Sequence, residues 1–211
     1  MQLVKSQFMS NKVQVIVCGF LLGLISVWAY YFQFEAAHFM ADYDYEASLI
    51  WQQPWRLVTA HFLHLTTLHW LGNVLALVGL TLVFARHFSV RTFLNALLIL
   101  TVGTSVILWL SGFDDRFVGL SAVNHGLLAM GILLEYKDAT SPSQQRLMLV
   151  AGTILLLKLA AEWIGLWHSP IAAAGQVHDL WQLHGAGIIS GILAWWLHNR
   201  HLARLAQLDT D

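Results

Sequence analysis

Charged residues and cysteine are both scarce in this chain of 211 residues. Only 11% of the residues are charged, whereas 57% are hydrophobic, and the mean hydropathy is +0.61. A soluble domain carries roughly 25% charged residues, so most of this surface faces something other than water. The single cysteine, Cys18, excludes a disulfide scaffold and a cysteine-based metal site. The net charge of −1, without a basic stripe, gives no indication of a nucleic-acid partner.

Long apolar segments fill most of the chain. A membrane-spanning helix needs about 20 mostly apolar residues. Six segments reach or approach this length: Val13–Phe32, Leu65–Ala85, Thr92–Leu110, Val118–Leu134, Leu147–Trp167 and Leu183–His198. The fourth and sixth contain polar residues, as helices that line a protein interior do. The first exceeds the roughly 7–15 apolar residues of a signal peptide, so we expect an uncleaved helix. The sequence predicts an all-α, six-span membrane protein with one domain over residues 1–211.

Lysine and arginine near the segment ends predict the orientation. If the N-terminus is cytoplasmic, the inside segments hold Lys5, Lys12, Arg86, Arg91, Lys137, Arg146, Arg200 and Arg204, and the outside loops hold Arg56 and Arg116. Positive charge collects on the cytoplasmic side, so both termini are expected there. The longest connection, Glu35–His64, then lies outside. Its length and its aromatic residues, Trp51 and Trp55, suit a functional loop at the membrane interface.

Polar residues occupy the first turns of the three predicted helices that run inward from the outer face. They are His69 and Asn73 on the second, Ser121 and His125 on the fourth, and His184 on the sixth. Polar groups at this depth are costly unless paired or wetted, so we expect a functional cavity. Gly187 and Gly191 share a stripe with His184 and would let the sixth helix approach a neighbour closely. Approach to the fourth helix would bring Nε2 of His184 within ~3 Å of Oγ of Ser121, as a general base requires.

Four motifs in this order resemble those of the rhomboid proteases. They are Trp55-Arg56, His69-x-x-x-Asn73, Gly119-Leu120-Ser121 and His184-x-x-Gly187-x-x-x-Gly191. The resemblance implies a rhomboid-like helical bundle with its core at about residues 50–198, and an intramembrane serine endopeptidase. It implies Ser121 as the nucleophile and His184 as the general base and then acid, a dyad without the acidic third member of the usual triad.

The resemblance also assigns the supporting residues. His69, Asn73 and the backbone N–H of Ser121 would form the oxyanion hole. Gly119 would allow an open backbone before the nucleophile, and Trp55 and Arg56 would anchor the outer loop. His64 also matches a family position, with a structural role. No cofactor or metal is expected, because His61-x-x-His64 matches zinc signatures poorly. Plainer interpretations are interhelical contacts for His69 and Asn73, and loop anchoring for His61 and His64.

Two residues depart from the family pattern. Ala122 replaces the usual glycine after the nucleophile, and His125 replaces the tyrosine that stacks on the catalytic histidine. His125 could still stack, or it could hydrogen-bond His184 and tune the dyad. These departures and the small size resemble the rhombosortase branch. That resemblance implies a protein of the bacterial inner membrane whose site opens to the periplasm. Its partners would be membrane lipid and surface or secreted proteins anchored by a C-terminal Gly-Gly, hydrophobic helix and basic tail.

Lys158 and Glu162 on the fifth segment suggest alternatives. They are four residues apart and can pair along the helix, either as a structural pair or as a polar patch near a substrate gate. A small transporter would use them with the histidines as a proton relay, but it requires polar residues throughout the membrane depth. A non-catalytic rhomboid-like protein that binds or escorts membrane proteins tends to lack the serine or histidine, and both are present here. Within the protease hypothesis, hydrolysis and transfer to another nucleophile both stay open.

Overall fold

Helices make up most of the computed structural model, which describes residues 2–35, 38–167 and 180–208, with side chains from Ser10 onward. The long helices are α1 (Gln2–Glu35), α4 (Thr67–Phe84), α5 (Val90–Leu110), α6 (Ser121–Asp138), α7 (Pro142–Trp163) and α9 (Leu180–Leu208). Short helices fill the connections: α2 (Phe39–Tyr43), η1 (Ala47–Leu49), α3 (Arg56–Thr59), η2 (Ala60–Phe62) and η3 (Ala85–His87). The predicted all-α class is confirmed. Each expected apolar segment coincides with one long helix. Of the basic residues used for the orientation, Lys5 lies outside the described side chains.

Several helix ends differ from the approximate bounds of the expected segments, and local chemistry explains three of these differences. The fourth segment was expected to be helical from Val118, but α6 begins at Ser121, because Gly119 has φ +122° and interrupts the helix. The fifth segment was expected to run from Leu147 to Trp167. Instead α7 begins at Pro142, where the Ser141 side chain accepts a hydrogen bond from the Gln144 N–H. It ends at Trp163, just before Gly165 with φ +73°.

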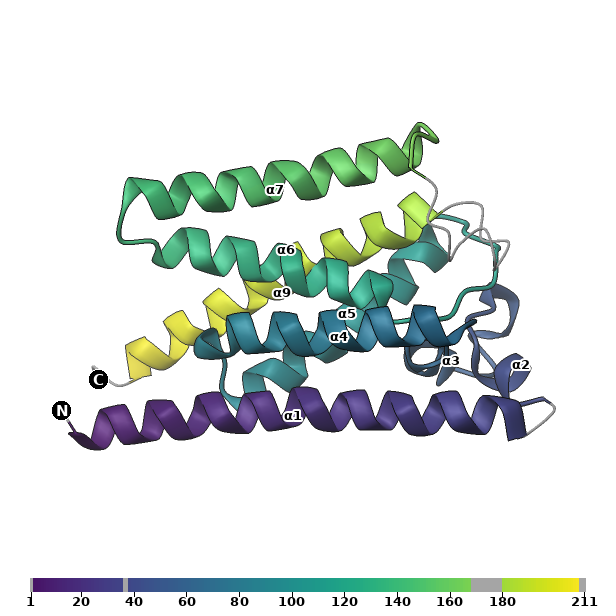
Figure 1. Ribbon diagram of the computed structural model, residues 1–211, viewed down its shortest axis with the longest axis horizontal. Helices are drawn as coiled ribbons and strands as arrows, with labels where there is room; N and C mark the ends of the chain where they lie inside the picture. Colours follow the sequence, from purple (N-terminus) through teal and green to yellow (C-terminus); the bar gives the residue numbers. More distant parts are fainter. Residues whose placement is uncertain (1, 36–37, 168–179, 209–211) are drawn as a thin grey trace.

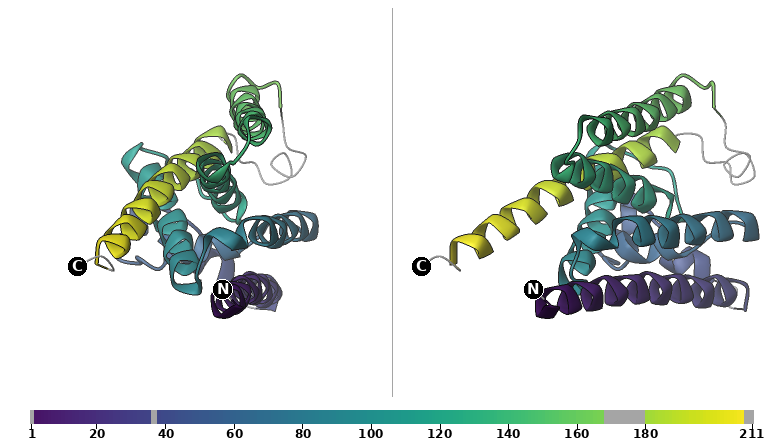
Figure 2. Two further views of the ribbon diagram at one scale, coloured as in Figure 1. Left: turned by 90° about the vertical axis from the view of Figure 1, so that its left-hand side faces the viewer. Right: turned by 60° about the vertical axis from the view of Figure 1, so that its left-hand side comes forward.

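The helices pack as a bundle with α6 and α9 at its centre. Helix α9 packs along both α6 and α5, α1 packs on α4, and α7 lies at an edge against α6 and α9 (Figures 1 and 2). The beginning of α1, the end of α9 and the connection between α6 and α7 lie at the same end of the bundle (Figure 1). The connection that holds α2 and α3 lies at the opposite end. We call this second end the α2–α3 end.

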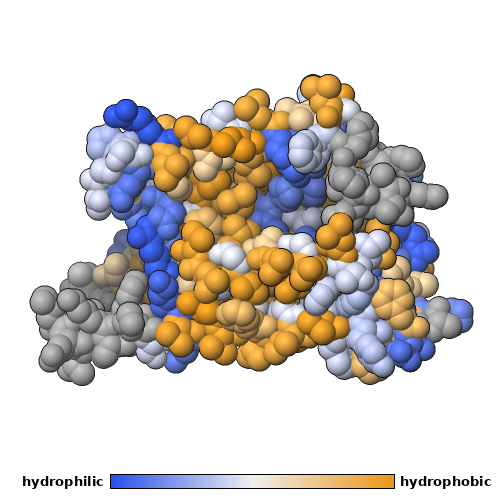
Figure 3. All heavy atoms as spheres, in the orientation of Figure 1, coloured by the Kyte–Doolittle hydropathy of each residue, from blue (hydrophilic) through white to orange (hydrophobic). Residues whose placement is uncertain are grey.

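Much of the outer surface is apolar. The segments Ser10–Glu35, Thr67–His87 and Val90–Leu110 are long and apolar enough to cross a membrane. Large hydrophobic side chains point outward, such as Leu24 on α1, 62% exposed, and Ile154 on α7, 61% exposed. Together they form a broad hydrophobic band between more polar ends (Figure 3). An apolar surface of this extent requires an apolar environment such as lipid. Spanning by α6, α7 and α9 stays a prediction.

Glycines bring the backbones of α6 and α9 together. A Cβ atom added at Gly187 would overlap the carbonyl oxygen of Ala122, and one added at Gly191 would overlap that of Gly126. Small residues at a helix crossing permit this contact, because no side chain holds the backbones apart. The predicted close approach between these helices is confirmed. It brings the first turn of α6, with Ser121, alongside the part of α9 that carries His184.

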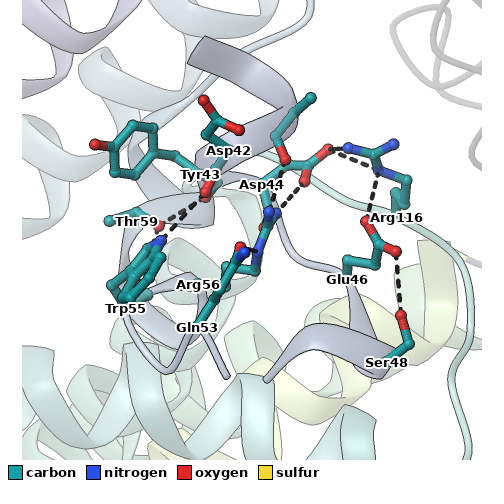
Figure 4. Close-up of polar contacts among 11 residues, drawn as sticks. Asp42, Tyr43, Asp44, Glu46, Ser48, Gln53, Trp55, Arg56, Thr59 and Arg116 are labelled. Atoms are coloured by element: carbon teal, nitrogen blue, oxygen red, sulfur yellow. Dashed lines mark hydrogen bonds and ion pairs between the residues drawn. The ribbon is translucent and has the colours of Figure 1, made fainter. Parts of the chain in front are cut away.

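A network around Arg56 holds the connection between α1 and α4 (Figure 4). The Arg56 side chain is 2% exposed and donates to Oδ1 and to the backbone oxygen of Asp44, each at 2.8 Å. Arg116 contacts the other carboxylate oxygen of Asp44 at 2.7 Å. The Trp55 indole N–H donates to the Asp42 carbonyl at 3.2 Å. The buried Arg56 guanidinium is tolerated because the Asp44 carboxylate offsets its charge and the Asp44 oxygens accept its hydrogen bonds.

Candidate functional site

Gly119 sets the position of Ser121. Its φ of +122° is accessible to glycine and strained for other residues, and its N–H donates to the Ala60 carbonyl at 2.9 Å. A Cβ atom there would lie 2.7 Å from Cε1 of His69, so a larger residue would collide with that ring. The chain therefore passes close to α4 immediately before α6 starts. Ser121, the first residue of α6, is placed beside His69 as a result.

The predicted polar residues meet in one cavity of about 220 Å³. Its polar lining comes from α4, α6, α7 and α9 and consists of His69, Asn73, Ser121, His125, Lys158, Glu162 and His184. The structure thus brings Ser121, His184, His69, Asn73 and His125 to the lining of one cavity. Among the contacts of the described residues there is no hydrogen bond between Oγ of Ser121 and Nε2 of His184, so the separation of ~3 Å expected for this pair stays a prediction. Gly119 lies just outside the lining, and Trp55 and Arg56 belong to the loop network. In Figure 3, a recess of hydrophilic residues between α7 and α4 interrupts the hydrophobic band.

Helix α4 presents two unpaired polar atoms near the cavity. Asn124 donates its Nδ2 to the backbone oxygen of Asn73 at 3.0 Å and lies 3.4 Å from its Oδ1. Nδ2 of Asn73 and Nδ1 of His69 are both buried without a hydrogen-bond partner among the described residues. A buried donor without a partner is costly, and such groups occur where a ligand or transition state completes them. Asn73 is therefore a donor available to an oxygen atom in the cavity.

His61 and His64 tie the preceding loop to other helices. His61 is fully buried, and its Nε2 donates to the Thr101 carbonyl of α5 at 3.1 Å. Burial lowers the pKa of His61 to about 4 and that of His64 to about 3. The backbone N–H of His64 donates to Oε1 of Gln33 on α1 at 3.1 Å. Neither histidine lines the cavity, which agrees with the loop-anchoring interpretation.

His125 stacks on His184. The two ring centroids are 4.0 Å apart, and the rings are inclined by 21°. Nδ1 of His125 lies 2.7 Å from the backbone oxygen of Ser121, one turn earlier in α6. Of the two geometries expected for a histidine at this position, the structure shows the stacked one. His184 itself is 5% exposed, so its ring is held between α6 and α7.

Sequence reasoning missed the contacts of Lys158 and Glu162. They do form the predicted pair along α7, with Nζ 2.7 Å from Oε1. However, Oε2 of Glu162 also lies 2.8 Å from Nδ1 of His184, and Nζ of Lys158 lies 2.7 Å from Nε2 of His125. Depth along the helices could have indicated this, since Glu162 is one residue from the end of α7 and His184 is near the start of α9. The clustering at one level also argues against a relay through the membrane.

Comparison with known proteins adds one match. The family model described as Rhomboid domain matches residues 51–201, well over half of the chain. The matched span contains every polar residue of the cavity, the glycines of the α6–α9 contact and the loop residues Trp55 and Arg56. No curated protein matches the sequence.

Proposed function

The chain belongs to the rhomboid family and is a multi-pass membrane protein, and we propose that it is an intramembrane serine endopeptidase with Ser121 as nucleophile and His184 as general base. The observation that carries this proposal is the cavity in which the start of α6, the buried His184 of α9 and the unpaired Asn73 amide meet. A nucleophile, a base and a free donor around one space are the parts that acyl transfer requires.

The chemistry follows from these positions. Nε2 of His184 takes the proton of the Ser121 hydroxyl while Oγ attacks the carbonyl carbon of the scissile peptide. The Asn73 amide, His69 and the Ser121 N–H stabilise the negative oxygen that forms. His184 then gives its proton to the leaving amine. Water, or another nucleophile, resolves the acyl-enzyme and regenerates the serine.

The substrate is a protein held in the membrane by a C-terminal helix. The polar recess between α7 and α4 lies within an apolar surface, so a segment arriving from lipid can reach polar groups there (Figure 3). The cavity lies toward the α2–α3 end of the bundle, because its polar residues occupy the first turns of α4, α6 and α9. By the distribution of Lys and Arg, this end faces the periplasm and both termini face the cytoplasm.

We assign the rhombosortase branch and its substrate class from the two departures, Ala122 and His125. His125 stacks on His184 where the family's tyrosine would, while also contacting Lys158. A rhomboid whose catalytic histidine has these altered neighbours suits a narrow substrate class. The substrates would be surface or secreted proteins with a C-terminal Gly-Gly, hydrophobic helix and basic tail, cut near the outer face of the inner membrane.

Co-expression with a substrate of that kind tests the function. We expect the wild type to shorten the substrate, and Ser121→Ala and His184→Ala to leave it uncut. A fluorophosphonate probe should label the wild type and not Ser121→Ala, independently of the substrate chosen. Equal processing by all three proteins would contradict the protease function. Absence of labelling, with retained substrate binding, would favour a non-catalytic escort protein instead.

A further inference from the structure

The cavity contains a carboxylate that the Ser121–His184 dyad does not use. We propose that Glu162 is a third, positioning member of the site, which holds His184 by Nδ1 and completes a Ser–His–Glu arrangement. The inference rests on the proposed protease function and deepens it. Its basis is the contact between Nδ1 of His184 and Glu162, at 2.8 Å from Oε2 and 3.1 Å from Oε1, with the Glu162 side chain only 2% exposed.

The hydrogen positions can be assigned from His125 outward. Nδ1 of His125 faces the Ser121 carbonyl oxygen, which can only accept, so Nδ1 carries the hydrogen. Nε2 of a neutral His125 is then an acceptor, and it lies 2.7 Å from Nζ of Lys158. Lys158 therefore donates to His125 and, at 2.7 Å, to Oε1 of Glu162. Two of its three donors are used in these two bonds.

The same reasoning fixes the tautomer of His184. An ionised Glu162 can only accept, so its short contact with Nδ1 requires the hydrogen to sit on Nδ1. Nζ of Lys158 also lies 2.9 Å from this nitrogen, but Nδ1 cannot carry a hydrogen and accept one at once. The carboxylate provides the shorter contact, and Lys158 already has two acceptors. The lone pair of His184 is therefore on Nε2, the nitrogen that a base needs toward Ser121.

The charges suit this role. Before reaction, Lys158 and Glu162 form an ion pair, which offsets the cost of burying the carboxylate. When His184 takes the Ser121 proton at Nε2, it becomes an imidazolium that still donates through Nδ1 to Glu162. The carboxylate stabilises that positive charge at the step where it forms. On transfer of the proton to the leaving amine, His184 returns to the neutral Nδ1–H tautomer, so no proton is gained or lost overall.

A merely structural role for Glu162 predicts different behaviour. As a link between α7 and α9, it would support stability and substrate binding, and its removal would lower the melting temperature and raise KM. As a positioning residue it acts on the chemical step. Its removal then lowers kcat and leaves KM nearly unchanged, because substrate binding does not require the imidazolium.

Kinetics of three variants in detergent test the proposal. We expect Glu162→Gln to reduce kcat on the order of 10²–10⁴-fold, by analogy with loss of the acid from a triad. Fluorophosphonate labelling of Ser121 should slow in parallel, and Glu162→Asp should recover part of both rates. The matched control is Glu135→Gln, the same change at a carboxylate of α6 that pairs with Arg86 and His87 away from the cavity. It should keep the wild-type kcat.

Two outcomes distinguish a failure of the Glu162 proposal from a failure of the proposed protease function. If Ser121→Ala stays active, the protease function itself fails. If Ser121→Ala and His184→Ala are inactive while Glu162→Gln keeps the wild-type kcat, only the role of Glu162 is overturned. Melting temperatures show whether each variant is folded. Should the Glu162 variants not fold, the wild type labelled with ¹⁵N-histidine decides: His184 should carry its hydrogen on Nδ1 at neutral pH, and an Nε2–H tautomer would overturn the proposal.

Discussion

His61 is a residue through which pH should act on the stability of the fold. It lies outside the long helices, it is fully buried, and burial lowers its pKa from 6.5 to about 4. Below pH 6.5 the unfolded chain binds a proton that the folded His61 does not take up until the pH nears 4. The folded state therefore loses stability as the pH falls from 6.5 to 4. This difference in pKa between the unfolded and folded states lowers the free energy of unfolding by roughly 3 kcal/mol at pH 4 and below.

We expect His61→Gln to flatten this pH dependence. Glutamine can still donate to the Thr101 carbonyl, but it has no proton to take up in this range. The measurement is the melting temperature in detergent between pH 7 and pH 4. In both the wild type and His61→Gln, His64 still makes the melting temperature fall as the pH falls, because its pKa is lowered to about 3. His38→Gln, at an exposed position of the same connection, is the control. A slope equal to that of the wild type in His61→Gln would contradict the assignment.

The order of the site residues and the close contact of α6 with α9 could be predicted from the sequence, but the contact of α7 with α9 could not. Ser121, His184, His69 and Asn73 were expected in one cavity because their motifs fall at equal depth on three parallel helices, and they do line one. The contact of Glu162 with His184 was missed. It depends on how α7 is rotated against α9, and the apolar residues of α7 follow no periodic pattern that fixes this rotation.

The contact between α6 and α9 is the element on which the site's geometry most depends. Two backbones touch where Gly187 faces Ala122, so a methyl group at position 187 must push the helices apart. We expect Gly187→Ala to destabilise the protein by about 1–3 kcal/mol, the usual cost of overpacking. Activity should fall too, because the same shift would move His184 away from Ser121. Thermal unfolding followed by tryptophan fluorescence gives the stability.

Gly185→Ala is the matched control on the same helix. A Cβ atom there would meet Leu159 at 3.8 Å, an ordinary van der Waals contact. Alanine is the better helix former by roughly 0.5–1 kcal/mol, so this variant should be as stable as the wild type or more so. Equal melting temperatures for Gly187→Ala and Gly185→Ala would show that the backbones are not in contact.

Helix identity was predictable and helix ends were less so. The six apolar segments each became one long helix, and three of these helices are long and apolar enough to cross a membrane. The start of α6 depended on the positive φ of Gly119, at a place where His69 leaves no room for a side chain, and the apolar pattern does not show this contact. The start of α7 followed from Ser141 and Pro142, a cap and first-turn signal that lies in polar sequence outside the apolar run.

For the whole molecule, the charged residues at the two ends predict a membrane orientation. At the end where α1 begins and α9 finishes, Arg86 pairs with Glu135, and Lys137 bonds Asn199. At the α2–α3 end, the acidic residues Asp44 and Glu46 surround Arg116. Lysine and arginine are retained on the cytoplasmic side during insertion, so the first end should be cytoplasmic.

Cysteine accessibility tests this orientation, because Cys18 is the only native cysteine. In a Cys18→Ser background, Gln52→Cys places a thiol at an exposed position of the connection between α1 and α4. Gln145→Cys places one at an exposed position in the first turn of α7, at the opposite end. We expect a membrane-impermeant maleimide to label position 52 in intact spheroplasts and position 145 only after the membrane is disrupted. The reverse pattern would place the Ser121 cavity toward the cytoplasm and exclude tails exposed in the periplasm as its substrates.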